Sequence, residues 1–512
     1  MKKFDAIVIG SGLGGMSAAA TLAKKGYKVQ VIEPHDKVGG FATSYRRKGY
    51  RMEAGIHVVG LGLPGTWAHE FYDFLDIQKN VPFAKLENFY ECRVNGNTYV
   101  MPANAEAARD SLIRQFPHER AGIDNYFKTM LELTAHFEQF IFRRPFIPAT
   151  SPLFAVVYAK WQKYWKMNVG FYLNGIITDP ILKSILLANV TFYHDNPFDL
   201  SLVIYMLSQF SYYVGGCYFI KGGSQSYSDY LRKIVEDNGG EVLTLHEVYH
   251  LKTNGKQVTS VCYRKVRGER SEFESTAAAI FVNAAIPLVK NWLSESSEWS
   301  KRESLISSHG KSVSFTSLNV GLSCPLKELG SSEYMSVQIE ARNNQLDLSR
   351  VYQGNFGVLD YNFYDDRDSF ELVPKGRYMV EAMYTDHMEN WEKVSEQEYE
   401  GVKQAHMDFM LGKLESEYPG LRKQVTYAEL GTPRTIVNYV HQPQGVVYGY
   451  SPSPAAIEAR SSSFQMYGGS GDPYFENMFY NSAWSFLPGF LGCNIAGYKA
   501  VIEAEARGVL KL

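Results

Sequence analysis

A glycine-rich segment near the N-terminus has the spacing of a pyrophosphate-binding turn. It reads Gly10-Ser11-Gly12-Leu13-Gly14-Gly15 and fits the G-x-G-x-x-G pattern. Gly10 permits a tight turn, Gly12 lets a pyrophosphate approach the backbone, and Gly15 lets a helix pack closely on a strand. Glu33 follows 23 residues after Gly10 and can accept hydrogen bonds from ribose hydroxyls. An acid at this position repels a 2′-phosphate, which favours FAD or NAD over NADP.

The elements around this segment form a strand, a helix and a second strand. The apolar run at residues 6–9 predicts a buried parallel strand that ends at the turn. Residues 16–25 predict a helix that ends at Gly26, and residues 28–32 predict a strand that ends at Glu33. The phosphates of a dinucleotide would then lie at the positive N-terminus of the helix.

Two further segments after the acid favour FAD over NAD. They read Gly39-Gly40-Phe41 and Gly55-Ile56-His57. A glycine pair just past the acid lets the backbone approach the ribityl chain and the flavin. His57 is the candidate catalytic residue, because a histidine beside the flavin could donate a proton to a carbanion-like carbon. The alternative is a hydrogen-bonded structural histidine.

These segments resemble the extended glycine signature of the amine-oxidase-like flavoproteins. Within that group, Gly-Ile-His-x-x-Gly at residues 55–60 is similar to the retinol saturase, carotenoid isomerase and phytoene desaturase family. The resemblance continues at residues 215–224, 279–285 and 477–500. It departs at Phe41, where many relatives have arginine. It also departs at Asn481-Ser482, where many flavoproteins of the wider group have an aspartate that holds the ribityl chain.

The resemblance implies FAD as the cofactor and adds residues to its site. Val242 would contact the adenine end, and Ala284 would lie in a strand at residues 279–285 that runs back toward FAD. Pro488 opens a C-terminal helix whose N–H groups favour the negative charge of a reduced flavin. The full set of predicted cofactor-binding residues is Gly10, Gly12, Leu13, Gly14, Gly15, Glu33, Gly39, Gly40, Phe41, Gly55, Ile56, His57, Val242, Ala284, Ser482, Pro488, Gly489 and Phe490. We predict no metal site.

The predicted fold class is α/β, with a Rossmann-type FAD-binding domain, an interleaved α+β substrate domain and a helical cap. We expect a discontinuous FAD-binding domain at residues 1–70, 215–290 and 455–512. The substrate-binding domain with its cap would occupy residues 71–214 and 291–454. Residues 140–166 mix aromatic side chains with Lys and Arg, which suits a membrane interface or a cap helix with a solvated basic face.

Composition excludes several other classes of protein. The 512 residues hold 52 Lys and Arg against 54 Asp and Glu, so a strongly basic nucleic-acid-binding surface is excluded. A hydrophobic share of 45% and a charged share of 21% exclude a highly charged disordered chain. The five cysteines form no C-x-x-C pair, which excludes a disulfide scaffold and a zinc ribbon. Without a signal peptide or a long apolar run, we expect a cytoplasmic protein, and peripheral membrane contact and the oligomeric state stay open.

The residues and the resemblance together predict an FAD-dependent oxidoreductase that acts on carbon–carbon double bonds of a long apolar substrate. A carotenoid- or retinoid-like polyene and an unsaturated lipid both fit this description. Saturation, desaturation and isomerisation stay open. The alternatives are an amine oxidase-like flavoenzyme and a non-catalytic lipid-binding protein of the same fold.

Overall fold

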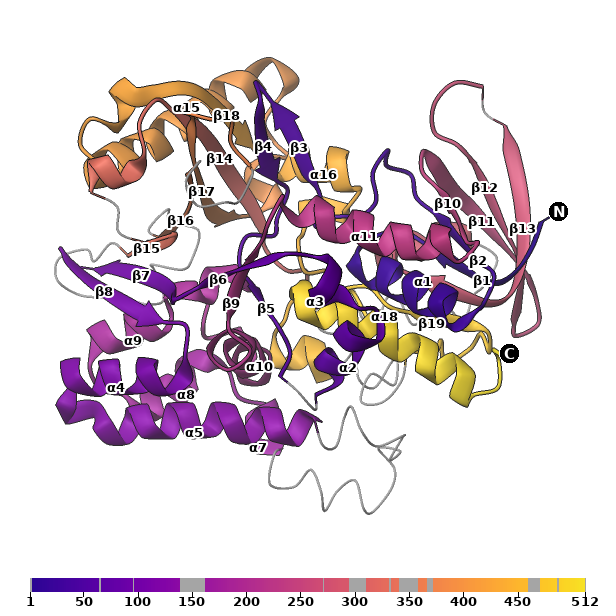
Figure 1. Ribbon diagram of the computed structural model, residues 1–512, viewed down its shortest axis with the longest axis horizontal. Coiled ribbons are helices and arrows are strands. Elements are labelled where there is room, and N and C mark those ends of the chain that lie inside the picture. The colour runs from indigo at the N-terminus through magenta and orange to yellow at the C-terminus, as the bar shows by residue number, and fades with distance from the viewer. Residues whose placement is uncertain are drawn as a thin grey trace.

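Two large sheets and a group of helices make up the described part of the chain. The computed structural model describes residues 2–63, 66–94, 96–138, 162–269, 271–293, 310–330, 333–339, 358–365, 372–458, 470–485 and 488–511. Figure 1 shows the first sheet on the right beside both termini, the second sheet at upper left, and the helical group at lower left.

The first sheet has seven strands, in the order β10-β2-β1-β13-β12-β11, with β19 beside β13. The strands are β1 (Lys2–Ile9), β2 (Val29–Ile32), β10 (Glu241–Leu243), β11 (His246–Asn254), β12 (Gln257–Lys265), β13 (Glu272–Val282) and β19 (Met478–Tyr480). Strands β10, β2, β1, β13 and β19 run parallel, whereas β12 is antiparallel to both β11 and β13. Ala6 and Val8 face one apolar core while Ile7 and Ile9 face another, which explains the unbroken apolar run in β1.

Three helices lie side by side on one face of this sheet (Figure 1): α1 (Leu13–Lys25), α11 (Ser224–Asp237) and α18 (Gly489–Ala506). Helix α1 ends at Gly26, whose φ of 101° lies in the left-handed region that favours glycine. Helices α1 and α18 approach closely at Gly497. A Cβ at that position would lie 2.2 Å from the Gly14 carbonyl oxygen, so only glycine fits.

The second sheet also has seven strands, in the order β18-β14-β17-β16-β15-β7-β8. They are β7 (Asn88–Val94), β8 (Asn97–Pro102), β14 (Ser314–Leu322), β15 (Met335–Ile339), β16 (Val358–Asp365), β17 (Tyr378–Asp386) and β18 (Val425–Gly431). Only β15 and β7 pair in parallel among these described strands. Leu318, Val380 and Ala382 pack against Met410 and Leu414 of α15 (Glu396–Glu417), so this face of the sheet is covered by a helix.

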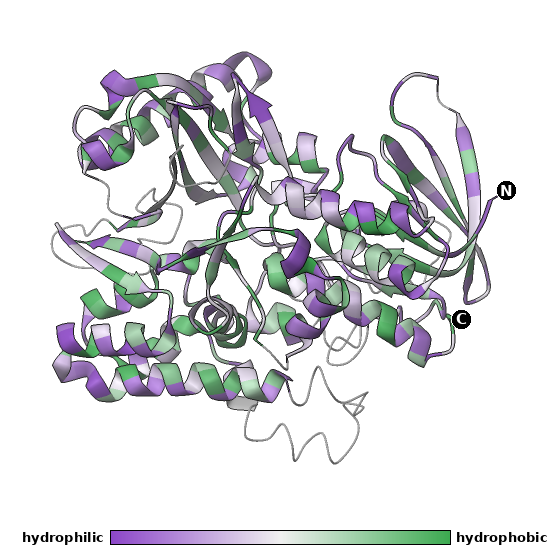
Figure 2. Ribbon diagram, in the orientation of Figure 1, coloured by the Kyte–Doolittle hydropathy of each residue, from purple (hydrophilic) through white to green (hydrophobic). Residues whose placement is uncertain are grey.

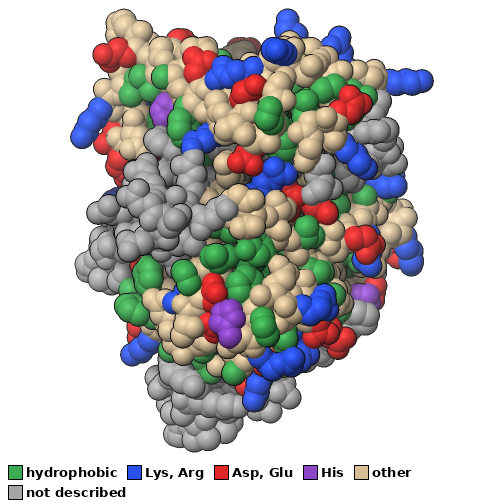
Figure 3. Space-filling view, turned by 90° about the vertical axis from the view of Figure 1, so that its left-hand side faces the viewer, with side chains coloured by type: hydrophobic (Ala, Val, Ile, Leu, Met, Phe, Trp, Pro, Cys, Tyr) green, Lys and Arg blue, Asp and Glu red, His purple; other side chains and the backbone are tan. Residues whose placement is uncertain are grey.

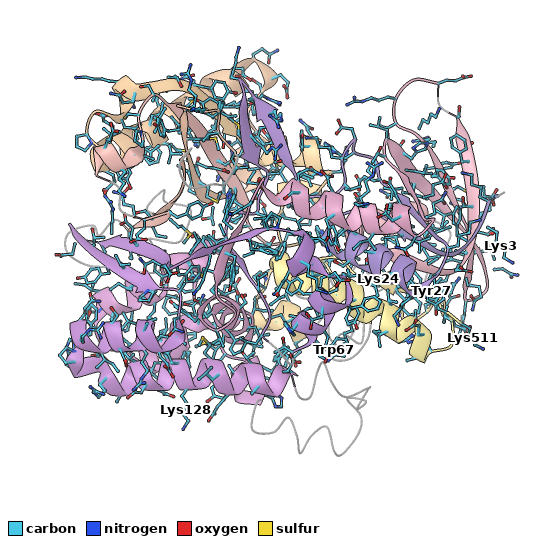
Figure 4. All side chains as sticks on the ribbon, in the orientation of Figure 1. Lys3, Lys24, Tyr27, Trp67, Lys128 and Lys511 are labelled. Carbon is cyan, nitrogen blue, oxygen red and sulfur yellow. The ribbon has the colours of Figure 1, made fainter. Side chains whose placement is uncertain are left out.

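The helical group comprises α4 (Ala105–Gln115), α5 (Arg120–Phe137), α7 (Gln162–Trp165), α8 (Val169–Ile176), α9 (Pro180–Leu186) and α10 (Leu202–Tyr213). Helix α5 is amphipathic, since Ile123, Phe127 and Met130 are buried on one side. Lys128 projects from its other side away from the molecule (Figure 4). Figure 2 shows α10 as a largely hydrophobic helix, which agrees with its buried side chains and with its packing on α5, α7 and α8.

Shorter elements join these layers. A hairpin is formed by β3 (Ser44–Arg47) and β4 (Tyr50–Glu53), and a small sheet by β5 (Val59–Gly60), β9 (Cys217–Ile220) and β6 (Phe83–Leu86). The remaining α-helices are α2 (Trp67–Phe74), α3 (Ile77–Asn80), α12 (Ile286–Trp292) and α16 (Pro433–Val440). The 3-10 helices are η1 (Pro117–Glu119), η3 (Ala188–Phe192), η4 (Leu326–Leu329), η5 (Met388–Asn390), η6 (Leu421–Gln424) and η7 (Pro443–Gly445).

The predicted fold class is confirmed, because a mostly parallel Rossmann-type sheet is interleaved with a second α+β region. Several element bounds differ from the prediction, and β1 begins at Lys2 and β2 at Val29. Helix α1 begins at Leu13, directly after the turn, and β13 ends at Val282, so Ala284 lies in the connection that follows the strand. The predicted domain boundaries stay a prediction. Of the segment with mixed aromatic and basic residues, positions 140–161 lie outside the described residues.

Within the described ranges, no helix has the length and apolarity needed to cross a bilayer. Figure 3 shows one face of the molecule, on which basic and acidic side chains are interspersed. This distribution agrees with a net charge of −2.

Replacement of Gly497 by alanine should destabilise the fold, because the new methyl group overlaps the Gly14 carbonyl oxygen. We expect Gly497→Ala to lower the free energy of unfolding by about 1–3 kcal/mol, the usual cost of overpacking. Gly401→Ala is the matched control, because Gly401 also lies inside a helix but has open space around its Cβ position. There alanine should raise stability by up to about 1 kcal/mol. Thermal denaturation of both variants measures the difference, and equal melting temperatures would contradict the proposed close packing.

An ion pair joins the helical group to the second sheet. His387, just after β17, approaches Asp195 with its Nε2 atom 2.7 Å from Oδ2. The hydrogen bond to Asp195 raises the pKa of His387, and burial opposes that rise. A histidine with a raised pKa stabilises the fold fully below its unfolded pKa of about 6.5, and this contribution is lost as pH rises through the folded pKa.

The free energy of unfolding of the parent should therefore fall between about pH 6 and pH 9 as this contribution is lost. We expect that fall to be smaller in His387→Gln by roughly 0.5–1 kcal/mol, as for a partly exposed ion pair. His118→Gln serves as the control, since His118 is 60% exposed beside Asp179. Melting temperatures of the parent and both variants across this pH range provide the measurement. An unchanged profile in His387→Gln would refute a stabilising role for the pair.

Candidate active site

A cavity of about 790 Å³ is lined by residues from both sheets. The first sheet and its connections contribute residues 9–14, 32–35, 39–43, 53–58, 283–285, 482–484 and 488–490. The second sheet contributes residues 315, 317, 381, 383 and 429–431. Its volume falls within the range of about 300–1,000 Å³ that small-molecule and cofactor sites occupy.

The glycine turn, residues 10–15, forms one wall of this cavity and has no room for side chains. Gly10 has a φ of 91°, and a Cβ there would lie 2.8 Å from the Asn283 carbonyl oxygen. At Gly14 a Cβ would lie 1.8 Å from the Asn481 carbonyl oxygen. Helix α1 begins at this turn, and no described side chain caps its N-terminus. Its free N–H groups can therefore bind a pyrophosphate.

Glu33 lies at the end of β2 and lines the cavity with 9% of its surface exposed. Its Oε2 atom accepts hydrogen bonds from the Ser11 amide at 2.8 Å and the Ser11 hydroxyl at 2.7 Å. The Oε1 atom accepts from the His35 amide at 2.8 Å. A carboxylate has about four acceptor sites. Glu33 therefore braces the glycine turn and retains capacity for a ribose hydroxyl.

The second glycine pair lies directly against the first turn. Gly39 and Gly40 have φ values of 122° and 60°, and the Gly39 amide donates to the Ser11 carbonyl at 2.8 Å. A Cβ at Gly40 would lie 3.2 Å from Cα of Gly12. Phe41 packs against Gly55, and both line the cavity. The structure thus brings the two predicted glycine segments together.

The C-terminal block also lines the cavity and lies next to the glycine turn, since a Cβ at Gly14 would overlap the Asn481 carbonyl oxygen. Gly489 has a φ of 83° at the first position of α18, and no described side chain caps that helix. The Ser482 hydroxyl is buried without a hydrogen-bond partner among the described residues. An orphaned hydroxyl beside a free helix N-terminus fits a polar group of a bound cofactor. These features, together with the glycine turn, show that the residues present fit FAD.

Sixteen of the eighteen predicted cofactor-binding residues line the cavity, and Gly15 and Val242 do not. A Cβ at Gly15 would lie 2.1 Å from the Gly10 carbonyl oxygen, so Gly15 allows α1 to pack on the turn. Val242 lies in β10 opposite Val31, where it packs against the main apolar core. The cavity near the end of β2 is instead lined by Val248 and Val266.

Besides Glu33, the titratable side chains at the cavity wall include Glu53, His57 and Glu381. Glu53 and Glu381 are buried, and the His57 side chain is 10% exposed. Glu53 holds the start of α11, because it accepts hydrogen bonds from the Ser224 amide and hydroxyl. Burial raises the pKa of Glu53 to about 7, although these hydrogen bonds oppose the rise. Burial lowers the pKa of His57 to about 4, so His57 is neutral at pH 7.

Glu381 is the residue of this group that sequence reasoning missed. Its Oε1 atom lies 3.5 Å from Nε2 of His57. Burial, followed by the negative charge of Glu53, raises the pKa of Glu381 well above its usual range. A signal was present in the sequence, because Glu381 is an acid flanked by Val380 and Ala382 inside an apolar strand. Charged residues are almost never fully buried unless they are paired or functional.

Aromatic side chains line much of the remaining cavity. They come from η3, α10, β14 of the second sheet and connecting segments, and they include Phe192, Tyr193, Tyr212, Phe315, Tyr448 and Trp484. Such a surface binds an elongated apolar molecule and excludes water.

Comparison with known protein sequences supports this description. Residues 8–75 match the model of an NAD(P)-binding Rossmann-like domain. The chain is 25% identical to all-trans-retinol 13,14-reductase of Danio rerio over 481 residues, which cover 87% of this chain and 77% of that protein. It is 24% identical to a chloroplastic prolycopene isomerase of Daucus carota over 469 residues, which cover 88% of this chain and 72% of the isomerase.

Solved structures share the fold. An oxidoreductase from Methanosarcina mazei is 16% identical, with a TM-score of 0.64 over 98% of this chain and all of that protein. A putrescine oxidase bound to putrescine is 14% identical, with a TM-score of 0.62 over 98% of each chain. Sequence relatives and fold together identify the chain as an FAD-dependent oxidoreductase that resembles the retinol saturase, carotenoid isomerase and phytoene desaturase family.

Proposed function

We propose that this protein uses FAD to change carbon–carbon double bonds in a long apolar substrate, such as a polyene or an unsaturated lipid. The observation that carries the proposal is that one cavity extends from the glycine turn to a wall of aromatic side chains. A dinucleotide and an apolar substrate can therefore occupy the same enclosed space. The relatives named for reduction of retinol and isomerisation of prolycopene support this substrate class.

The cofactor-binding residues follow from the geometry of the walls. The glycine turn and the N-terminus of α1 would hold the pyrophosphate, and Glu33 would accept from the ribose of the adenosine half. Gly39 and Gly40 would let the backbone approach the ribityl chain. Ser482 and the N-terminus of α18 would lie against the flavin, where helix N–H groups stabilise negative charge.

Bound FAD supplies the electron transfer, and the side chains of this protein determine where the substrate lies and how protons move. The aromatic wall would orient the apolar chain and keep water away from the reacting carbons. His57 is neutral at pH 7. It would act as a hydrogen-bonding group at the cavity wall, and a proton would have to come from another residue.

An amine oxidase-like activity is the second candidate, because a putrescine oxidase shares the fold. Tyr448 and Trp484 both line the cavity and could flank an amine. Two buried carboxyl groups also lie at its wall. The raised pKa values of Glu53 and Glu381 favour their neutral forms, which weakens the attraction for a cationic amine.

An anaerobic visible spectrum tests the proposed function directly. We expect the purified protein to carry an oxidised flavin band that bleaches on reduction. One class of polyene or unsaturated lipid, presented in phospholipid vesicles, should then restore the band. Co-sedimentation with the same vesicles reports the peripheral membrane contact that such a substrate would favour. Putrescine and other amines are the control substrates, and reduction of the oxidised flavin by an amine alone would support the second candidate.

Substitution of Glu33 tests the assigned cofactor position. Glu33→Gln removes the charge from hydrogen bonds that brace the glycine turn, and it weakens the acceptor for ribose. We expect the Kd for FAD to rise about tenfold, since a hydrogen bond to a charged group contributes about 1.5–3 kcal/mol. The matched control is Glu241→Gln, whose carboxylate accepts from Lys2 and Gln30 away from the cavity. Fluorescence titration with FAD gives the Kd of each variant. A Kd for Glu33→Gln equal to that for Glu241→Gln would contradict the assigned cofactor position.

A further inference from the structure

Glu381 lies on the face of β17 that points toward the cavity. Side chains alternate along a strand, so Val380 and Ala382 face α15 while Glu381 and Met383 line the cavity. Asn319 is the register partner of Glu381 on β14, and Glu429 of β18 is opposite Asn319. The acid thus belongs to a polar strip inside a mostly apolar site.

The surroundings of Glu381 do not neutralise a carboxylate. Its side chain is 3% exposed, and Oε2 has no hydrogen-bond partner among the described residues. The titratable groups near it are His57, Glu53 and Tyr45, and Tyr45 donates no hydrogen bond to it among the described contacts. None of these three groups is a cation at pH 7, because burial lowers the pKa of His57 to about 4.

The protonated form is therefore the stable form of Glu381 in the resting protein. Burial of an unpaired carboxylate costs several kcal/mol, whereas a carboxylic acid costs far less. Burial and the nearby Glu53 raise the pKa of Glu381 well above its usual range. A neutral acid that lines an apolar cavity holds a proton that it can donate, as in enzymes that use a buried carboxyl group as a general acid.

We propose that Glu381 is the proton donor in the reduction of a carbon–carbon double bond, a role that rests on the proposed function. The π bond of the substrate breaks, and one carbon accepts the proton of Glu381 while its neighbour accepts a hydride equivalent from reduced FAD. Two C–H bonds form and the O–H bond of Glu381 breaks. The substrate is reduced, FAD is oxidised, and Glu381 becomes a carboxylate that regains a proton from solvent after the product leaves.

The proposal also selects a direction for the reaction. A desaturase needs a base that is already deprotonated when the substrate binds. Among the described residues, no cation lies beside the buried acid Glu381, so its protonated form can donate a proton. The geometry at Glu381 thus favours saturation over desaturation as the activity of this cavity.

The test compares the holoenzyme with Glu381→Gln, which preserves the size and the neutral state of the side chain. We expect its FAD content, melting temperature and KM to match the parent. The turnover of the polyene that reoxidises the parent flavin should fall at least about a hundredfold, as general-acid catalysis contributes about 10²–10⁴. The matched control is Glu91→Gln, because Glu91 is a fully buried carboxylate of the same sheet that pairs with Arg93. Its turnover should stay close to that of the parent.

Infrared difference spectroscopy adds a readout that does not depend on turnover. At pH 7 the spectrum of the parent holoenzyme minus Glu381→Gln should show the C=O stretch of a protonated carboxylic acid. The same difference with Glu91→Gln, whose parent side chain pairs with Arg93, should lack this acid band. A missing acid band, or full turnover by Glu381→Gln, would overturn the role of Glu381 and leave the proposed function standing. A parent flavin that no polyene reoxidises would overturn the proposed function and this role with it.

Discussion

The close approach of three backbone segments at the glycine turn is the constraint on which the rest of the structure depends. The turn lies against the end of β13 at Gly10, against the connection after β19 at Gly14, and against α18 through Gly497. A single methyl group at any of these contacts would overlap a carbonyl oxygen. Segments from the start, middle and end of the chain can therefore meet only because none of these residues has a side chain.

This meeting point determines where the cavity lies. The N-termini of α1 and α18 both face it, so two sets of free N–H groups are available to one ligand. The second sheet forms another wall of the cavity, because residues on one face of β14, β17 and β18 line it. The other face of that sheet packs on α15, which fixes which side chains can reach a substrate.

The buried carboxyl groups at the wall of this cavity lower the stability of the fold. Glu53 recovers part of that loss by accepting a hydrogen bond from the first N–H of α11. Among the described residues, Glu381 has Nε2 of His57 at 3.5 Å and no hydrogen-bond partner at Oε2. A fold under selection for stability alone would place an apolar residue at such a position. The retention of an acid in an apolar strand is the kind of local conflict that marks a functional site.

The sequence by itself determined the Rossmann unit and the acid at its second strand, because these depend on local spacing. Gly10 to Gly15 and Glu33 belong to one continuous segment, so their geometry follows from neighbouring residues along the chain. Resemblance extended this reading to Ser482 and Pro488. Only the tertiary structure decided that Val242 lies off the cavity, since that depends on how β10 pairs with β2.

The position of Glu381 also came from the tertiary structure. Its role depends on which face of β17 is covered by α15 and on the approach of His57, more than 300 residues earlier in the sequence. Strand alternation predicts that Glu381 and Val380 face opposite sides, but it does not say which side holds a cavity. Long-range packing decides this, because α15 covers one face of β17 and the other face lines the cavity.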